Sequence, residues 1–401
     1  MNNPSLDDLL REELARRASG HLLRARPVVE SVQGARVRID GREYINFASN
    51  DYLGLSRHPR VIDAARDAAA RFGAGAAASP LITGYTPAHA AAERAMADWK
   101  CTESAVLLPS GYQTSQAVVQ TLAGVAGRHE PGVRFLLDRL AHASLVDAVQ
   151  AGGRSYRLFP HNQLGKLSRL LAEAPTGQLQ VVVTESVYSM DGDAAPLKEL
   201  AQLREQYGFV WLLDEAHGSG VYGDAGRGLA HEQGVAGAVD IHMATLSKAL
   251  GVAGGAVCAS RRFCDAVVNW GRAYIYSTAV APTVAGAIPV AIAVLRDEPQ
   301  RQQRVRRLAM NVRRELSRMG IRVPVGDSPI TPIVLGSESA AIAAADELKA
   351  KGLWVQPIRP PTVPPGTSRL RLTLSCEHGD EDITRLLAAM GDVWPRLGLH
   401  A

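Results

Sequence analysis

Short apolar runs alternate with helical stretches along the middle of the chain. The runs have the length of buried strands and lie at residues 105–108, 133–137, 181–184, 209–213, 241–244 and 255–259. Helical patterns separate several of them, at residues 114–122, 144–150 and 196–207. Such alternation is typical of an α/β protein whose mostly parallel sheet carries helices on both faces. Functional groups in these folds gather at the carboxyl ends of the strands.

The N-terminal part predicts a helix and a hairpin. Residues 5–26 open with an S-x-x-D capping pattern at Ser5 and Asp8, and leucines recur at helical spacing among many arginines. We expect a docked surface helix with a solvated basic face rather than a membrane-binding one. Arg24 at its end is a candidate contact for an anionic substrate tail. The Asp40-Gly41 turn between two apolar runs predicts a hairpin.

The character of the chain changes after residue 295. A charged helical stretch, several short strands and a final helix follow, at residues 296–318, 330–335, 340–351, 370–374 and 380–393. This pattern predicts a smaller α+β domain. We therefore expect three parts, namely a helix and hairpin segment at 1–48, a large domain at 49–294 and a small domain at 295–401.

Composition excludes several classes of protein. The 401 residues are 46% hydrophobic and 21% charged, which argues against disorder, and the net charge of +4 comes without a dense basic tract for nucleic acid. An anionic thioester substrate fits this charge, but ordinary solubility explains it equally well. The apolar stretch 279–295 is interrupted by Pro282 and Pro289, which favours a buried helix over a membrane span. Four scattered cysteines and the lack of a signal-like N-terminus predict a reducing, cytoplasmic location without a zinc site or other metal centre.

Two motifs at strand ends carry the chemistry. Asp214 and His217 follow the run 209–213, and Thr245 and Lys248 follow the run 241–244. A lysine amine forms a Schiff base with an aldehyde cofactor, while an aspartate keeps the pyridine nitrogen of that cofactor protonated. A lysine near glycines is often a solvated loop residue, and Asp-x-x-His is often a cap. Their occurrence in order, each at a strand end, favours a pyridoxal phosphate (PLP) site.

Further polar residues follow other strands. Gly111 and Tyr112 open a helix after residues 105–108, and amides at a helix start bind phosphate. His142 follows the run 133–137, where it could lie over a cofactor ring or serve as a structural histidine. Ser189 is a candidate polar contact after the run 181–184. Arg359 lies in a proline-stiffened loop and suits carboxylate recognition, unless it is an ordinary surface arginine.

Five motifs, in order along nearly the whole chain, resemble the α-oxoamine synthases of the fold type I PLP enzymes. They are Ser49-Asn50-Asp51-Tyr52-Leu53-Gly54, Ser189-Met190-Asp191-Gly192-Asp193, Asp214-Glu215-Ala216-His217-Gly218, Thr245-Leu246-Ser247-Lys248 and Arg359-Pro360-Pro361-Thr362-Val363-Pro364. The resemblance implies a large domain with a seven-stranded, mostly parallel sheet between helices, a small C-terminal domain and a homodimer with shared active sites.

The resemblance also implies residue roles. Lys248 would hold the cofactor and move the Cα proton, Asp214 would keep the ring nitrogen charged, and His142 would stack on the ring. His217 would contact the phenolic oxygen, with Ser189 nearby. The phosphate contacts would come from Gly111, Tyr112 and Thr245 and from Thr278 of the partner subunit. The substrate contacts would be Arg359 for the amino-acid carboxylate, together with Asn50 and Arg24.

Within the family, the arginine–proline loop and residues 138–145 are most similar to members that condense L-alanine with a pimeloyl thioester, with loss of carbon dioxide, in biotin synthesis. One segment departs from the family pattern: residues 75–81 read Gly-Ala-Ala-Ala-Ser-Pro-Leu where relatives are rich in glycine and serine. Sibling activities that join glycine to acetyl-CoA or succinyl-CoA, or serine to a long acyl chain, therefore stay open. A non-catalytic PLP-binding subunit is a further alternative, which the presence of Lys248 disfavours.

Overall fold

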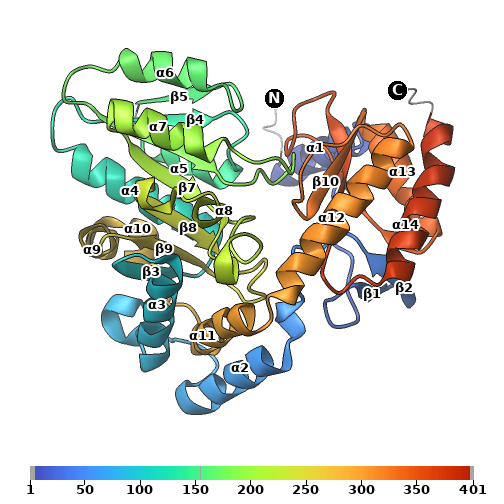
Figure 1. The fold of residues 1–401 in the computed structure, drawn as a ribbon, viewed down its shortest axis with the longest axis horizontal. Helices are drawn as coiled ribbons and strands as arrows, with labels where there is room; N and C mark the ends of the chain where they lie inside the picture. The colour runs from blue at the N-terminus through green and yellow to red at the C-terminus, as the bar shows by residue number, and fades with distance from the viewer. Residues whose placement is uncertain (1–4, 154, 398–401) are drawn as a thin grey trace. The chain divides into compact units, whose positions relative to one another are not determined.

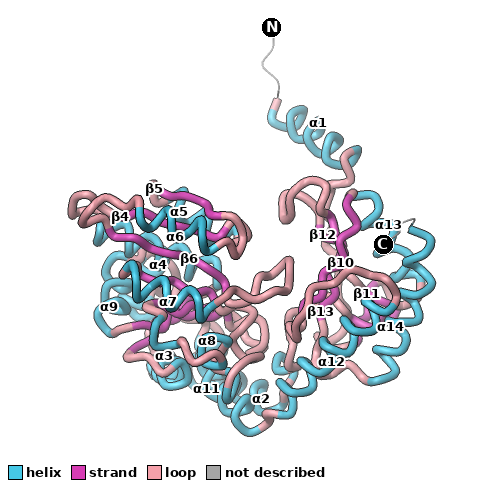
Figure 2. The backbone as a smooth tube through the Cα atoms, turned by 45° about the horizontal axis from the view of Figure 1, so that its top comes forward, coloured by secondary structure: helices cyan, strands magenta, loops and turns pink. Residues whose placement is uncertain are grey.

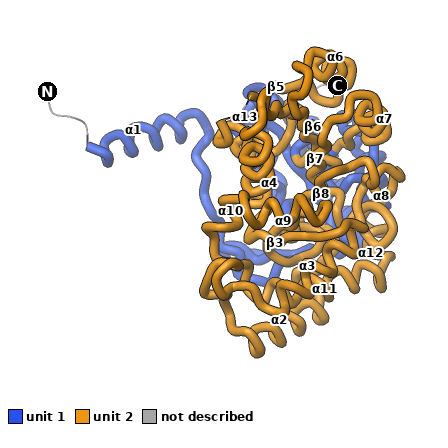
Figure 3. The backbone as a smooth tube through the Cα atoms, turned by 90° about the vertical axis from the view of Figure 1, so that its left-hand side faces the viewer, with its two compact units in different colours: residues 1–49, 190–192, 307–401 blue, residues 50–189, 193–306 orange. Residues whose placement is uncertain are grey.

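The structure is a computed structural model that describes residues 5–153 and 155–397. The chain divides into two compact units (Figure 3). Unit 1 contains the chain up to Ser49, the short segment Met190–Gly192 and the chain from Arg307 onward. Unit 2 contains Asn50–Ser189 and Asp193–Arg306.

Unit 2 is built on a seven-stranded sheet (Figure 1). The strand order is β3 (Ser104–Leu108), β9 (Gly255–Ala259), β8 (Ile241–Thr245), β7 (Val210–Asp214), β6 (Leu179–Glu185), β4 (Val133–Asp138) and β5 (Ser155–Phe159). Neighbours from β8 to β5 are parallel, and only β9 runs antiparallel to both of its neighbours. The expected fold class, with a mostly parallel sheet, is confirmed.

The core of unit 2 lies between this sheet and a layer of helices. The covering helices include α4 (Gly111–Ala126), α5 (Ala143–Ala151) and α9 (Arg261–Trp270). Apolar side chains such as Val118, Phe135 and Leu145 are fully buried in this layer. Elsewhere, α11 (Pro282–Asp297) packs against α2 (Pro59–Phe72) and α3 (Pro87–Lys100). The alanine-rich stretch is therefore a buried helix, as its interruption by prolines predicts.

Unit 1 contains two small sheets, the N-terminal helix α1 (Leu6–Ser19) and three further α-helices (Figure 2). One sheet has the order β10 (Ile330–Gly336), β13 (Ser368–Thr373) and β12 (Gln356–Ile358). The other joins the hairpin β1 (Arg36–Ile39) and β2 (Arg42–Asn46) to β11 (Leu353–Trp354). The further helices are α12 (Gln300–Arg318), which carries the chain over from unit 2, α13 (Glu338–Ala350) and α14 (Asp380–Val393).

Two helix predictions need correction. The helix expected over residues 5–26 is α1 (Leu6–Ser19), which ends because Gly20 caps it and His21 adopts a left-handed φ of 56°. Its leucines are not docked within this chain, since α1 has no buried residue. The charged helix expected at 296–318 is divided between α11 and α12, because Pro299 lies at the junction and cannot donate a helical hydrogen bond.

The short segment Met190–Gly192 is anchored inside unit 1 by two buried arginines. Arg369 donates to the Met190 carbonyl at 3.1 Å and to Asp191 Oδ1 at 2.7 Å. Arg313 donates to the Gly192 carbonyl at 3.2 Å. A side chain at Gly192, whose φ is +63°, would place its Cβ 2.2 Å from the Ile330 carbonyl oxygen, so only glycine fits. None of the described helices combines the length and apolar character needed to cross a membrane.

Candidate active site

A cavity of about 200 Å³ lies where several strands of unit 2 end. Residues from the ends of β6, β7 and β8 and from the starts of α4 and α5 form its wall. The lining residues are Gly111, Tyr112, His142, Ser144, Glu185, Asp214, Ala216, His217, Thr245, Ser247 and Lys248. The fold therefore brings most of the residues expected to bind a cofactor into one cavity, as the parallel strand order requires.

Asp214 and Lys248 supply the charges of this cavity. Asp214 is the last residue of β7, is 5% exposed, and accepts a hydrogen bond from the Ala216 amide at 2.9 Å. Burial raises the pKa of Asp214, and the positive charge of Lys248 opposes that rise. A buried carboxylate of this kind gains stability from a cationic partner, which a protonated pyridine nitrogen would provide.

One end of the cavity suits an anion. Gly111 is the first residue of α4, so its amide belongs to the unpaired donors of a helix start. Thr245, at the end of β8, lies so close that a Cβ at Gly111 would be 2.6 Å from Thr245 Oγ1. Only glycine leaves space between the helix start and this hydroxyl. The helix-start amide and this hydroxyl are both hydrogen-bond donors for a phosphate oxygen, and together they form a phosphate cradle.

His142 begins α5 at the edge of the cavity. Its Nδ1 accepts a hydrogen bond from the Ser144 amide at 3.2 Å and lies 2.8 Å from Ser144 Oγ. Because an amide can only donate, Nδ1 is the acceptor and the neutral ring carries its proton on Nε2. Ser144 Oγ is in turn 2.9 Å from Ser115 Oγ. The ring orientation of His142 is thus set from its outer edge, which leaves its face available for a cofactor ring.

A buried hydrogen-bond chain approaches the cavity from Asn50. The Tyr52 hydroxyl lies 2.7 Å from Nδ1 of His217 and 3.2 Å from Oδ1 of Asn50. Tyr52 is fully buried and His217 is 4% exposed. The sequence indicated Asn50 and His217 but not the tyrosine that joins them. Its place two residues after Asn50 in a polar motif is the only signal for it.

Glu185 is an acidic lining residue of the cavity that sequence reasoning did not select. It ends β6, directly beside Asp214 in the β6–β7 register. Its Oε1 accepts the His142 amide at 2.6 Å. Burial and the neighbouring charge of Asp214 raise the pKa of Glu185 well above its ordinary value. An acidic residue at the end of a buried strand, the position that Asp214 also occupies, was the available signal.

An ion pair lies behind the cavity wall. Lys100 Nζ donates to Glu215 Oε2 at 2.9 Å and to Ser219 Oγ at 2.7 Å, and both charged side chains are fully buried. Lys100 thereby holds the pKa of Glu215 well below its usual range in spite of burial. Because Glu215 follows Asp214 directly, this pair fixes the main chain at the end of β7. Removal of one partner would leave a buried charge uncompensated.

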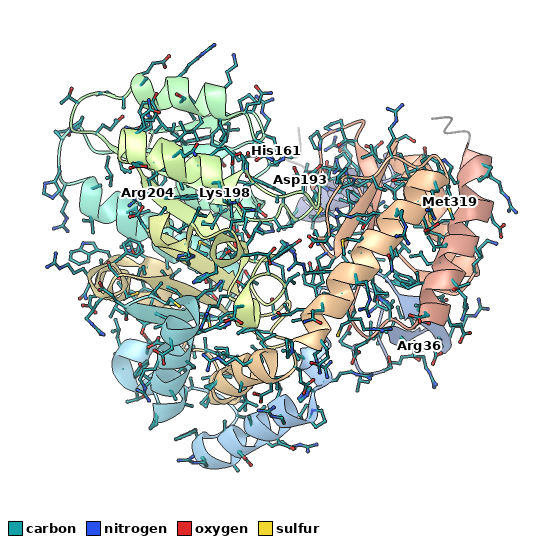
Figure 4. The ribbon with its side chains drawn as sticks, in the orientation of Figure 1. Arg36, His161, Asp193, Lys198, Arg204 and Met319 are labelled. Carbon is teal, nitrogen blue, oxygen red and sulfur yellow. The ribbon has the colours of Figure 1, made fainter. Side chains whose placement is uncertain are left out.

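His161 forms a clamp between two carboxylates: Asp138, at the end of β4, and Asp193, in the segment that follows β6. Its Nδ1 lies 2.9 Å from Asp138 Oδ1 and its Nε2 lies 2.8 Å from Asp193 Oδ2; His161 and Asp193 are labelled in Figure 4. Although burial opposes it, hydrogen bonding to the two carboxylates raises the pKa of His161 to about 10. The protonated ring therefore ties the strand before His142 to the segment that follows Ser189.

The remaining predicted site residues lie outside the cavity lining. Ser189 is buried and its amide interacts with Glu185, whereas Thr278 is exposed on the same unit. Arg24 and Arg359 belong to unit 1. Arg359 donates to the carbonyls of His21 and Leu23, and Arg24 donates to Thr362 Oγ1 at 3.3 Å.

PLP fits the groups of this cavity. A lysine amine, a buried carboxylate and a helix-start phosphate cradle occur together, with two histidines between them. These are the groups that an aldehyde, a pyridine nitrogen and a phosphate ester require.

Three comparisons agree with this geometry. A family model described as aminotransferase class I and II matches residues 42–390. The chain is 42% identical to 8-amino-7-oxononanoate synthase from Anaeromyxobacter dehalogenans, with 94% of this chain and 93% of that protein covered. It is 41% identical to the synthase of the same name from Aeromonas salmonicida, with the same coverage.

Among solved structures, serine palmitoyltransferase from S. paucimobilis with bound PLP is similar over 98% of this chain and 100% of that chain, with 30% identity and a TM-score of 0.91. 8-Amino-7-oxononanoate synthase from Francisella tularensis is similar over 89% of this chain and 99% of that chain, with a TM-score of 0.75. Its identity of 23% supports the fold alone.

Proposed function

Because the chain belongs to the aminotransferase class I and II family and, within it, to the α-oxoamine synthases, we propose that it joins L-alanine to a pimeloyl thioester. The products are 8-amino-7-oxononanoate, carbon dioxide and the free thiol, and the reaction belongs to biotin biosynthesis. The enzyme depends on PLP. The observation that carries the proposal is the identity of about 41% to several 8-amino-7-oxononanoate synthases over most of the chain.

When bound, PLP supplies an aldehyde that links to amines and a protonated ring that accepts the electron pair of a bond broken at Cα. Asp214 holds the proton on the ring nitrogen, since its buried carboxylate is stabilised by that positive charge. His142 would hold the face of the ring, and His217 would hydrogen-bond the phenolic oxygen. Lys248 holds the cofactor and then removes the Cα proton of L-alanine.

The other contacts position phosphate and substrate. The amide of Gly111, Tyr112 and the Thr245 hydroxyl bind the phosphate, joined by Thr278 of the partner subunit in a homodimer. Thr278 is exposed in this chain, as a residue donated to a second copy requires. Sedimentation of the purified protein tests this part, and an active monomer would contradict it.

On the substrate side, Arg359 binds the alanine carboxylate, with Asn50 and Arg24 beside the substrate. The Arg359 guanidinium now donates to the His21 and Leu23 carbonyls, so part of this set must exchange when a carboxylate binds. Neither nucleic acid nor a membrane is a partner in this proposal. Four free cysteines fit a cytoplasmic enzyme.

A serine palmitoyltransferase-like activity is the second candidate, because the TM-score of 0.91 to that enzyme exceeds the 0.75 to the Francisella synthase. The experiment supplies L-alanine, glycine or L-serine with pimeloyl, acetyl or palmitoyl thioesters to the PLP-loaded protein. Thiol release and product mass are measured for every pair. We expect turnover with L-alanine and the pimeloyl thioester, on CoA or on an acyl carrier protein. Preferential condensation of serine with the palmitoyl thioester would overturn the proposal.

A further inference from the structure

Two acidic side chains lie next to each other at the floor of the cavity. Glu185 and Asp214 are paired residues of the neighbouring parallel strands β6 and β7. Both line the cavity, and they are only 2% and 5% exposed. Two buried carboxylates on paired residues repel each other when both are ionised, which favours a proton on one of them.

The contacts of the two residues differ in kind. Glu185 accepts the amide of His142 at 2.6 Å and interacts with the amide of Ser189. One side chain thereby holds the main chain at two residues that are expected beside the cofactor ring. Main-chain amides carry no charge, so this role does not require Glu185 to be ionised. Asp214 instead experiences the positive charge of Lys248 most directly among its neighbouring side chains.

We propose that Glu185 is a positioning residue of the cofactor cavity: as a neutral carboxylic acid it fixes the main chain at His142 and Ser189, and it leaves Asp214 as the single negative charge facing the ring nitrogen. This proposal rests on the PLP-dependent function given above. It does not depend on which amino acid or thioester the enzyme uses.

The electrostatic surroundings support the neutral form. Burial is the main cause that raises the pKa of Glu185, and the charge of Asp214 on β7 adds to it. The charge of Lys248, after β8, and the two amides act in the opposite direction and are outweighed. A neutral carboxylic acid still accepts amide hydrogen bonds through its carbonyl oxygen. Glutamine has the same shape, accepts in the same way and has no charge.

The test compares Glu185→Gln with Glu185→Ala in the absence of substrates. The dissociation constant of PLP is measured by titration, together with the pH dependence of the cofactor absorbance. We expect Glu185→Gln to bind PLP within about threefold of the unaltered protein and to keep its absorbance midpoint. We expect Glu185→Ala to bind PLP about tenfold more weakly or worse, because two amides lose their acceptor.

Infrared spectroscopy detects the protonated carboxylic acid directly. It compares only the unaltered protein with Glu185→Gln, so it does not depend on whether Glu185→Ala folds. The unaltered protein should show the band of a protonated carboxylic acid at neutral pH, and Glu185→Gln should lack it. Equal losses of PLP affinity in the two variants, or the absence of that band, would overturn the neutral acid. Unchanged affinity in a folded Glu185→Ala variant would overturn the positioning role. Failure of the alanine and pimeloyl assignment alone would alter none of these results.

Discussion

The hydroxyl of Tyr52 and the imidazole of His217 meet at 2.7 Å in the buried wall of the active-site cavity. A second contact of the same hydroxyl, with Asn50 at 3.2 Å, limits how it can turn. Because one phenolic hydrogen serves one acceptor at a time, its direction is coupled to the tautomer of His217: donation to Asn50 goes with a proton on Nδ1, and donation to Nδ1 goes with a proton on Nε2. The Tyr52 hydroxyl is therefore a direct partner in the proton arrangement of His217.

Tyr52→Phe should lower turnover more than it lowers stability. Loss of a buried hydrogen bond costs about 1 to 1.5 kcal/mol, which corresponds to roughly a tenfold decrease in kcat/KM if the bond acts on the cofactor. Steady-state kinetics with L-alanine and a pimeloyl thioester measure this effect. Tyr44→Phe, in the hairpin of unit 1, is the matched control. A kcat/KM equal to that of the control would show that Tyr52 only packs.

Lys248 should be the point of covalent attachment of the cofactor. Borohydride treatment of the PLP-loaded protein should fix the cofactor on one peptide, and peptide mapping should locate it at residue 248. Lys248→Ala should retain the phosphate cradle of Gly111 and Thr245 but lose covalent attachment and turnover. Lys100, buried in its ion pair with Glu215, is the internal negative control. A reduced adduct on any other lysine would refute the assignment of the site.

Arg359→Ala should weaken L-alanine binding while PLP binding stays intact. A charged contact to a carboxylate that is shielded from water is worth about 2 to 5 kcal/mol, so the loss should reach at least roughly thirtyfold. Titration of the PLP-loaded variants with L-alanine, followed by absorbance, gives both affinities. Arg66→Ala, which removes an exposed arginine of α2 that pairs with Asp63, serves as the control. Unchanged affinity in Arg359→Ala would transfer the role to Arg371.

The clamp at His161 should make stability depend on pH in one direction. The folded-state pKa of His161 is raised from 6.5 to about 10. A raised folded pKa gives stability that is fully present below pH 6.5, declines as pH rises, and is lost above about 10. The difference in Tm between the unaltered protein and His161→Gln should therefore be largest near pH 6 and should shrink towards pH 10. A difference that grows with pH would contradict the charged form.

Local patterns predicted the sheet of unit 2 because buried strands are continuous apolar runs. β5 was not predicted, because it is an edge strand with mostly exposed side chains, including Arg157, and so lacks a continuous apolar run. The cavity residues at strand ends could be predicted in the same way, since parallel strands end at one edge of the sheet. The role of Tyr52 could not be predicted from local sequence, because its partner His217 is 165 residues away. The contact between Arg359 and His21 spans 338 residues and likewise has no local signal.

Unit 1 is assembled from three separate segments of the chain, and this sets the order in which parts of the protein can fold during synthesis on the ribosome. All strands of the seven-stranded sheet have been made before Arg307 emerges, so unit 2 can fold while the chain is still growing. β2 must wait for its partner β11, because Ile45 pairs with Leu353. The carbonyls of Met190 and Gly192 also wait, since Arg313 and Arg369 are translated later. The nascent chain should therefore expose β2 and the segment Met190–Gly192 until the C-terminal part is released. We expect these two segments to be the first that a chaperone binds or a protease cuts.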